Sequence, residues 1–402
     1  MFGKLFSKKI DKNQFANLVA IAMKDVGVNV FHYDEEKFAF KLEDGGTCYL
    51  ENVFINFQAV TPSERDATIQ RYIAGVTVRE KTPDDFPSAK ESLIPIVRSM
   101  SYFQLLKLSA QSDGNYKSED SVPVQPLVGD LVVALAHDSK DSFSIVNGRV
   151  FDPWNVNFTT AIDIATDNLA AITDPAALVE ESAGVYVGSW GDSYESSRLL
   201  LSDVVKLASL DGDPVVCVPS RNTFWVTGNN NLGGLRVILE SAEQTHFGAY
   251  SLSPDLYILL EGHWQLFVPD DPELRKLLTN IQRRRQALDY GQQKEYLESI
   301  YEKEAIDVFV ASFTMYEEAN SKDMHSICVW SKNVDSMLPR TDRIVLLIDP
   351  ETKDRVSAGW ELALSVVGHL MERDPELIPE RYRVRSFPSE LEIAELRRRT
   401  ES

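Results

Sequence analysis

The sequence predicts an α+β protein of several domains, with mixed or antiparallel sheets flanked by helices. Along the chain, apolar residues at helical spacing alternate with short apolar runs that are typical of strands. Two strand-like runs, ending at Val218 and Leu260, are followed by another after only a few residues. Links this short join antiparallel strands, because a parallel pair needs a crossover. We therefore predict α+β rather than a doubly wound parallel sheet.

The first segment, residues 1–85, is expected to run helix, three strands, helix. Phe15, Leu18, Val19 and Ala22 share one face of its first helix. Ser63 is the expected N-cap of its second helix. The expected elements are a helix at 12–24, strands at 28–33, 37–42 and 47–57, and a helix that continues to Val76.

The central segment, residues 90–270, repeats strand and helix patterns. Asp113–Ser121 has the polar character of a surface loop, and Ile162, Ala165 and Leu169 mark one helical face. Strands are expected at 93–97, 127–136, 142–146, 184–188, 214–218, 223–227, 256–260 and 264–268. Helices are expected at 159–172, 194–209 and 232–245.

The last segment, residues 271–402, is expected to form a separate domain. A polar helical stretch at 271–303, with Gly291 near its middle, is interpreted as a linker helix followed by an opening helix. The order helix, three strands, helix then returns, without shared residues that indicate a duplication. The expected strands are 307–313, 325–330 and 343–348, followed by a helix at 357–371 and, over 379–402, an extended piece with a frayed helix.

The charge of the chain bears on its partners. With 61 acidic and 41 basic residues the formal charge is -20, which repels phosphate backbones and anionic lipids. Nucleic acid is therefore not an expected partner. The arginine runs 283–285 and 397–399 lie in helix-like stretches and are interpreted as solvated faces. No apolar run reaches the roughly 20 residues that span a bilayer, so integral membrane association is not expected.

The cysteines and the start of the chain indicate a compartment. Cys48, Cys217 and Cys328 lie far apart, each in a strand-like run, and are interpreted as reduced core thiols. Residues 1–10 lack the apolar stretch and cleavage site of a secretory signal. We therefore expect a cytoplasmic protein.

Three short stretches carry a family resemblance. They are Ile94–Ser99, Gly191–Leu200 and Val216–Val226, the last with a Val-Pro-Ser hairpin. In order and spacing they resemble the YtpQ-like family, bacterial proteins with a domain of unknown function. The resemblance covers roughly residues 10–270 and implies no established activity. The residues after Asp270 exceed the family's usual length, which favours an appended domain.

One turn is the best candidate for a site. The run from Ser189 to Tyr194 passes from a strand end through glycine into a predicted helix, where backbone N–H groups can hold an anion. Asp192, Tyr194 and Arg198 would surround that anion, and Arg98 joins them through the family resemblance alone.

The same turn also has a purely structural interpretation. Asp192 or Ser193 is a good N-cap, and Glu195 lies where a capping box needs it. Arg198 would then simply pair with an acidic side chain.

Other motifs predict no cofactor and no metal. Gly228–Gly234 precedes a helix but lacks the spacing and lysine of a P-loop, so it is interpreted as an asparagine-glycine turn. No serine or cysteine sits in a nucleophile-elbow motif. The six histidines never fall at metal-ligand spacing with one another or with a cysteine.

These observations favour a non-enzymatic function. An acidic chain of several domains without a catalytic motif is typical of a protein-binding or regulatory module, chaperone-like or immunity-like in architecture. The six tryptophans lie mostly near turns or strand edges, where they can anchor a partner or close a core. The alternative is an enzyme or a small-anion-binding protein with its site at the Asp192, Tyr194 and Arg198 turn.

Overall fold

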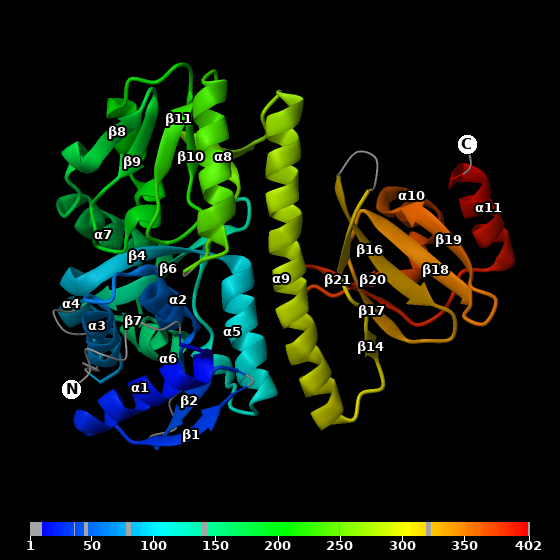
Figure 1. Ribbon diagram of the computed structural model, residues 1–402, viewed down its shortest axis with the longest axis horizontal. Helices are drawn as coiled ribbons and strands as arrows, with labels where there is room; N and C mark the ends of the chain where they lie inside the picture. Colours follow the sequence, from blue (N-terminus) through cyan, green and yellow to red (C-terminus); the bar gives the residue numbers. More distant parts are fainter. Residues whose placement is uncertain are drawn as a thin grey trace. The chain divides into compact units, whose positions relative to one another are not determined.

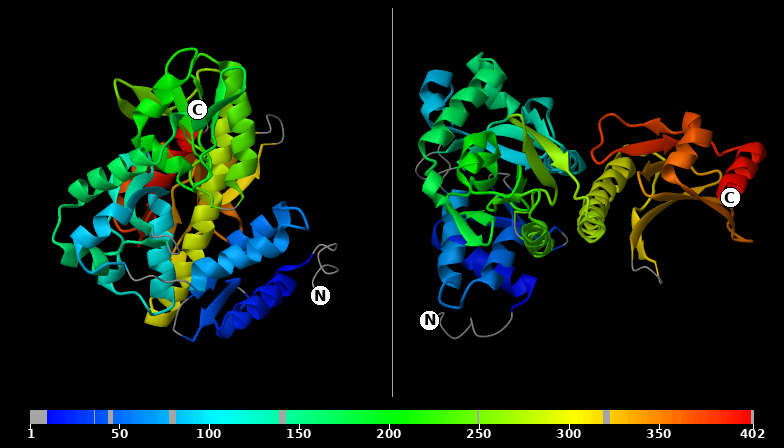
Figure 2. Two further views of the ribbon diagram at one scale, coloured as in Figure 1. Left: turned by 90° about the vertical axis from the view of Figure 1, so that its left-hand side faces the viewer. Right: turned by 90° about the horizontal axis from the view of Figure 1, so that it is seen from above.

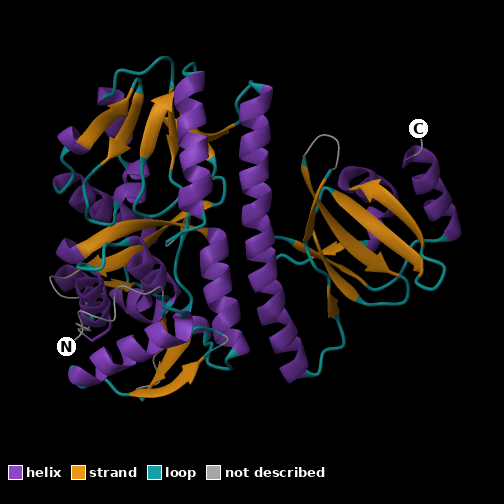
Figure 3. Cartoon of the chain, in the orientation of Figure 1, coloured by secondary structure: helices purple, strands orange, loops and turns teal. Residues whose placement is uncertain are grey.

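The computed structural model describes residues 10–35, 37–43, 47–77, 82–138, 143–248, 250–318 and 323–400. Its helices and largely antiparallel sheets confirm the predicted α+β class (Figure 3). The chain forms two compact units. The first comprises residues 1–97, 122–128 and 132–266, and the second comprises 98–121, 129–131 and 267–402. The three-segment organisation expected from the sequence stays a prediction.

The N-terminal lobe, residues 10–77 of the first unit, packs three helices around a small antiparallel sheet. Phe15, Phe40 and Phe57 are buried in its core, where the Phe15 and Phe57 rings are in edge contact. The capping box at Asp11 fixes the start of the first helix, which the sequence predicted correctly. The elements are α1 (Lys12–Asp25), β1 (Val30–Asp34), β2 (Ala39–Leu42), β3 (Thr47–Tyr49), α2 (Glu51–Ala59) and α3 (Arg65–Thr77).

The strand expected at 47–57 is wrong beyond Tyr49, because the chain turns there into helix α2. Val53, Phe54 and Phe57 are all buried in one core. A strand would send Val53 and Phe54 to opposite faces, whereas one helical face holds all three side chains. Packing therefore overrides the strand propensity of this run.

The central lobe, the rest of the first unit, contains two sheets. One has the order β4-β6-β5 with β7 paired to β6, and the other has the order β13-β12-β10-β11-β9-β8. Val216 pairs antiparallel with Val226, which confirms the predicted hairpin there. The strands are β4 (Leu93–Ser99), β5 (Gln125–Val128), β6 (Leu131–Asp138), β7 (Phe143–Ile145), β8 (Leu178–Ser182), β9 (Val185–Gly188), β10 (Pro214–Cys217), β11 (Trp225–Gly228), β12 (Leu256–Leu260) and β13 (His263–Phe267).

Helices flank these sheets, and α8 runs alongside β10 and β11 (Figure 1). The helices predicted at 159–172 and 232–245 are confirmed as α7 and α8. The α-helices of the lobe are α4 (Phe86–Ala89), α6 (Gly148–Phe151), α7 (Phe158–Ala171) and α8 (Leu232–His246).

The helix expected at 194–209 is wrong. Two 3-10 helices stand in its place, η5 (Glu195–Leu200) and η6 (Ser202–Leu207), separated by Leu201 at φ -107° and ψ 68°. Every residue from Glu195 to Leu199 is buried, including four polar ones. A segment with no solvent-facing side cannot form the amphipathic helix that the pattern indicated.

In the second unit, α9 (Pro272–Glu304) is one continuous helix rather than the two expected. Gly291 does not interrupt it, since a single glycine weakens a helix without breaking it. The helix α5 (Met100–Ser112), which was not predicted, packs along α9. Leu108 and Leu297 are buried in their shared cluster.

The rest of the second unit holds two four-stranded sheets, in the orders β14-β17-β21-β20 and β15-β16-β18-β19. The helices α10 and α11 lie on one face of the latter (Figure 2, right). The elements are β14 (Phe309–Val310), β15 (Thr314–Glu317), β16 (Met324–Ser331), β17 (Ser336–Pro339), β18 (Arg343–Asp349), β19 (Asp354–Gly359), α10 (Trp360–Val367), β20 (Glu372–Arg373), β21 (Arg381–Val384) and α11 (Glu390–Thr400).

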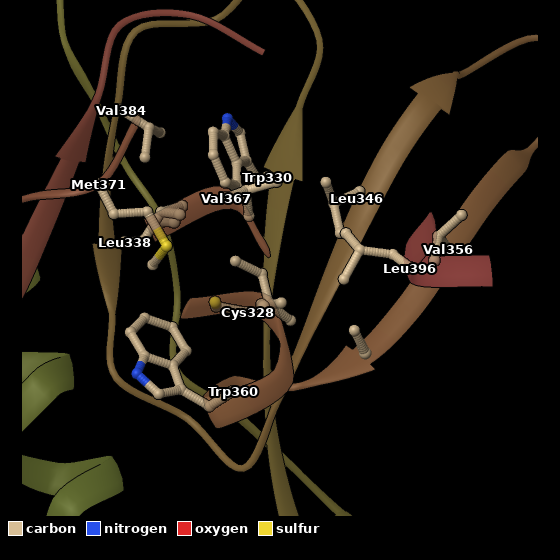
Figure 4. Close-up of a cluster of buried hydrophobic side chains, with 14 of the residues drawn as sticks. Cys328, Trp330, Leu338, Leu346, Val356, Trp360, Val367, Met371, Val384 and Leu396 are labelled. Atoms are coloured by element: carbon tan, nitrogen blue, oxygen red, sulfur yellow. The ribbon is translucent and has the colours of Figure 1, made fainter. Parts of the chain in front are cut away.

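The helix expected at 357–371 begins later, because β19 continues to Gly359. Val356 and Ala358 alternate toward the core beside β18, so period-2 burial governs this stretch. Trp330 and Trp360 are buried in the hydrophobic core that this sheet shares with α10 and α11 (Figure 4). Within the described part of the chain, no helix has the length and apolar character needed to cross a bilayer.

Candidate anion-binding pocket

The predicted site turn holds a buried ion pair. Arg198 is fully buried, and its two terminal nitrogens donate to the two carboxylate oxygens of Asp192 at 3.0 and 2.6 Å. Its Nε donates to Thr173 Oγ1 at 3.1 Å, and its guanidinium lies 4.2 Å from the centre of the Trp190 ring. The structure therefore brings Asp192 and Arg198 together with each serving as the other's partner.

The electrostatics of Asp192 reflect this pairing. Burial alone would raise the pKa of its carboxyl, but the hydrogen bonds from Arg198 and from the Tyr194 backbone N–H outweigh burial and lower that pKa. The predicted capping box differs in detail, because Asp192 accepts from Tyr194 N and Glu195 Oε1 accepts from Gly191 N at 2.8 Å. This supports the structural interpretation of the turn.

Of the other two predicted residues, Tyr194 contributes its backbone N–H to Asp192, and no contact of Arg98 with the ion pair is seen among the described residues. Tyr194 is buried, with its ring 6.4 Å from that of Phe143. Arg98 is buried near the end of β4 and belongs to the second unit. The ligand-binding role predicted for the four residues stays a prediction.

Beside this turn, within the first unit, lies a pocket of about 560 Å³, which we call the arginine pocket. Its volume falls in the range of small-molecule sites. Ser193, an exposed residue of the predicted turn, contributes to its wall. Besides Ser193, the wall comprises Val53, Asn56, Ala59 and Val60 at α2, Thr68, Arg71 and Tyr72 from α3, and Arg221, Asn222 and Tyr250 from two loops.

Arg221 is the main positive group of the arginine pocket. Its guanidinium lies over the Tyr250 ring, 3.7 Å from the ring centre, which fixes the plane of the guanidinium group. Its Nε is buried without a hydrogen-bond partner, and no carboxylate among the described residues pairs with it. None of the described lining residues is Asp, Glu or His. The pocket thus presents arginine charge that its own wall does not neutralise.

Backbone hydrogen bonds hold Arg221 in place in the β10–β11 hairpin. Its N–H donates to the Tyr250 carbonyl at 3.0 Å, and its carbonyl accepts from Ser196 N at 3.1 Å. The Ser220 and Thr223 hydroxyls lie 2.8 Å apart across the same turn. Three separate segments therefore fix the position of the arginine.

Two residues of the pocket wall have strained backbones. Ser193 and Tyr250 adopt positive φ angles of 67° and 61°, which residues other than glycine rarely do. Asn52 Oδ1 accepts from Tyr250 N at 3.1 Å, so the N-terminal lobe helps to hold this conformation. Strain of this kind is concentrated at functional sites and persists only where surrounding contacts impose it.

The opposite wall, from α2 and α3, is mixed in character. Arg71 brings a second arginine, and Val53 and Val60 bring aliphatic surface. The Tyr72 hydroxyl donates to the Tyr49 carbonyl at 3.1 Å, and burial raises the pKa of that phenol far above its usual value. Tyr72 is therefore a neutral part of the wall at physiological pH.

Sequence reasoning missed this pocket. Its residues come from five stretches separated by up to 197 positions, from Val53 to Tyr250, and none forms a motif. The available signal was local: Arg221 follows Pro219 and Ser220 in a predicted hairpin with no acidic residue beside it. An arginine in a tight turn without a neighbouring carboxylate is a weak pointer to a ligand.

The second unit also has a polar pocket, of about 390 Å³. Its charged groups already pair with each other or with neighbours: Arg340 contacts Glu380 at 2.9 Å, and Asp342 contacts Arg283 at 2.9 Å. Burial would raise the pKa of Asp342, but hydrogen bonds from Arg283 and Ser326 lower it. This pocket offers less unused charge than the arginine pocket.

One group of side chains in the described residues has the donor types for a metal ion. Glu318, Asp323 and His325 each place a ligand atom within 4.8 Å of the others. Lys276 contacts Asp323 at 2.7 Å, which supplies a competing positive charge. Histidine spacing along the chain did not reveal this group, because its acidic members lie on both sides of the β15–β16 connection.

The tryptophans serve mainly the interior. Trp330 and Trp360 are core residues, and the indoles of Trp154 and Trp264 donate to the carbonyls of Pro83 and Leu199.

Comparisons of the chain with family models, with curated proteins and with solved structures found no match, so the resemblance to the YtpQ-like family stays a prediction.

Proposed function

We propose that the first unit binds a small organic anion in the arginine pocket. The observation that carries this proposal is Arg221, held over Tyr250 with its Nε buried and without an acceptor. A buried polar group that lacks a partner costs about 1 to 3 kcal/mol, and a bound anion would recover part of this loss. Guanidinium groups match the planar geometry of carboxylate and phosphate oxygens.

The charge of the whole chain supports a small ligand over a polymer. At a formal charge of -20 the average surface repels polyanions. A small anion meets only the local field of the pocket, which Arg71 and Arg221 make positive. Cys48, Cys217 and Cys328 are buried and form no disulfide among the described residues, which favours a reducing compartment, so we place this activity in the cytoplasm.

Anion binding can be tested by isothermal titration calorimetry and thermal shift with inorganic phosphate, sulfate and citrate. We expect at least one of these anions to bind the wild-type protein, and Arg221→Ala to weaken it at least tenfold. Arg236→Ala is the matched control, because Arg236 is exposed on α8 and does not line the pocket. Equal binding by the Arg221→Ala and Arg236→Ala proteins, or no binding to the wild type, would contradict the proposal.

A second candidate function is protein binding by the second unit. On the β15-β16-β18-β19 sheet, Cys328 and Trp330 face the core, so Val329 faces the opposite side, where it is 39% exposed. Val345 pairs beside it on β18, and Tyr316 on β15 is also exposed. An apolar sheet face favours the protein-binding, chaperone-like or immunity-like interpretation.

This candidate is tested by affinity purification with point variants. Deleting the residues after Asp270 would remove α9, against which α5 packs, and would disrupt the unit instead of only the surface. We propose Val329→Asp, with Val237→Asp as the control, because Val237 is an exposed residue of α8. A partner that the wild type and the Val237→Asp protein retain and the Val329→Asp protein loses supports the candidate. Equal recovery by all three argues against this face.

A further inference from the structure

We infer that the ligand of the arginine pocket is a phosphate monoester with an apolar body, bound as the dianion. This inference rests on the proposed anion-binding function and names its ligand class. The pocket has two arginines, Arg71 and Arg221, and none of its described lining residues is acidic. Two arginines in a wall whose described residues include no carboxylate match a dianion better than a monoanion.

The donors of the wall also fit a phosphate. Ser193, Asn222 and Asn56 add hydroxyl and amide donors to the two guanidinium groups. A phosphate ester presents three strong acceptor oxygens, whereas a carboxylate presents two. The donors belong to three parts of the first unit: the N-terminal lobe, the Ser193 turn and the β10–β11 hairpin. They can therefore reach a ligand from several sides, as a tetrahedral phosphate requires and a planar carboxylate does not.

The size and the apolar wall indicate an organic ester rather than the free ion. A pocket of about 560 Å³ is far larger than one phosphate group. Val53, Ala59 and Val60 line the α2 side with aliphatic surface. Each methylene that is buried against such a surface raises the affinity about fourfold.

None of the described lining residues is Asp, Glu or His, which makes pH a clean probe of the ligand. The nearby carboxyls stay ionised between pH 5 and 8, because hydrogen bonds lower the pKa of Glu64 and hydrogen bonds from Arg198 and Tyr194 lower that of Asp192. Tyr72 stays neutral, because burial raises its pKa. A phosphate monoester has its second pKa near 6, so its dianion is depleted about tenfold between pH 7.5 and pH 5.

The test is calorimetric titration of the full chain with n-butyl phosphate, pentanoate and inorganic phosphate at pH 7.5 and pH 5.0. We expect n-butyl phosphate to bind at least tenfold more tightly than the other two, and its affinity to fall about tenfold at pH 5.0. Arg71 lies on the exposed face of α3, so Arg71→Ala is expected to fold. In this variant the pH dependence should shrink, because one positive charge no longer discriminates strongly between monoanion and dianion.

Other outcomes separate the two proposals. If pentanoate binds as tightly as n-butyl phosphate, or if the affinity for the ester does not change with pH, the phosphate inference is wrong while anion binding stands. If inorganic phosphate binds as tightly as n-butyl phosphate, the inference that the ligand has an apolar body is wrong. If none of these probes binds the wild-type protein, and sulfate and citrate do not bind it either, the proposed anion-binding function is wrong.

Discussion

Replacing Arg381 by alanine should strongly destabilise the second unit. Arg381 is fully buried on β21, and no carboxylate among the described residues pairs with it. Its guanidinium donates to Gln293 Oε1 at 2.5 Å and to the carbonyls of Ala311, Met337 and Tyr290 at 2.8, 3.0 and 3.2 Å. Burial lowers its pKa to about 10, so the side chain stays charged at neutral pH.

The magnitude follows from these four acceptors. The Arg381→Ala substitution removes the donor from all four acceptors. The loss of each hydrogen bond costs about 1 kcal/mol if water enters the space and replaces part of that bond. The expected loss is therefore about 4 kcal/mol, large against the 5 to 15 kcal/mol that stabilises a typical protein.

Hydrogen exchange followed by mass spectrometry is the suitable assay, because it reports the opening free energy of each segment separately. Peptides that cover β17 and β21 should lose about 4 kcal/mol of protection in the Arg381→Ala protein, while peptides of the first unit keep theirs. Arg385→Ala is the control, because Arg385 pairs with Glu372 at the surface and such pairs contribute about 0 to 1 kcal/mol. An Arg381→Ala effect no larger than that of the control would refute the reasoning.

Three further predictions concern stability in urea. Asp192→Asn leaves Arg198 buried without its counter-charge and should lower the free energy of unfolding by about 2 to 4 kcal/mol. Because the folded state lowers the pKa of Asp192, this stabilisation is present above about pH 4 and is lost as the pH falls further. The difference between the wild type and the Asp192→Asn protein should therefore shrink in acid. Gly228→Ala should cost about 1 to 3 kcal/mol, because a Cβ there would lie 2.0 Å from the Asp211 carbonyl oxygen; an unchanged midpoint would contradict this packing. Gly291→Ala should stabilise α9 by about 0.5 to 1 kcal/mol, since nothing lies within 4 Å of the added Cβ, and a loss of stability would speak against a continuous helix.

Elements with a clear period could be predicted from the sequence. The helices at 159–172 and 232–245 have apolar residues on one face and appear nearly as expected. The hairpin of β10 and β11 followed from its short link. In these places local pattern and tertiary packing agree, which is the condition under which sequence reasoning succeeds.

Errors occurred where composition alone suggested the wrong element. The segment 195–199 is buried throughout with polar side chains, so its composition suggested a surface helix that does not form. Val53, Phe54 and Phe57 suggested a strand by composition, although their common burial requires a helix. The sequence left both interpretations of the Asp192 turn open, and the bidentate contact with Arg198 favours the structural one.

The arginine pocket could not be predicted, because it depends on long-range packing. Arg221 and Tyr250 are 29 positions apart, and Arg71 belongs to another lobe. The sequence shows that Arg221 has no acidic neighbour along the chain, but it does not indicate that this arginine will stack on a tyrosine 29 positions away. Such sites become visible only when the fold shows which charges lack a partner.

The most direct test of the central claim is a crystal structure of the protein soaked in tungstate, a tetrahedral oxyanion with strong anomalous scattering. We predict an anomalous peak within hydrogen-bond distance of the Arg221 guanidinium, and its loss in Arg221→Ala crystals soaked in the same way. Peaks only at other places, or a peak in the arginine pocket that the Arg221→Ala substitution leaves unchanged, would contradict the account.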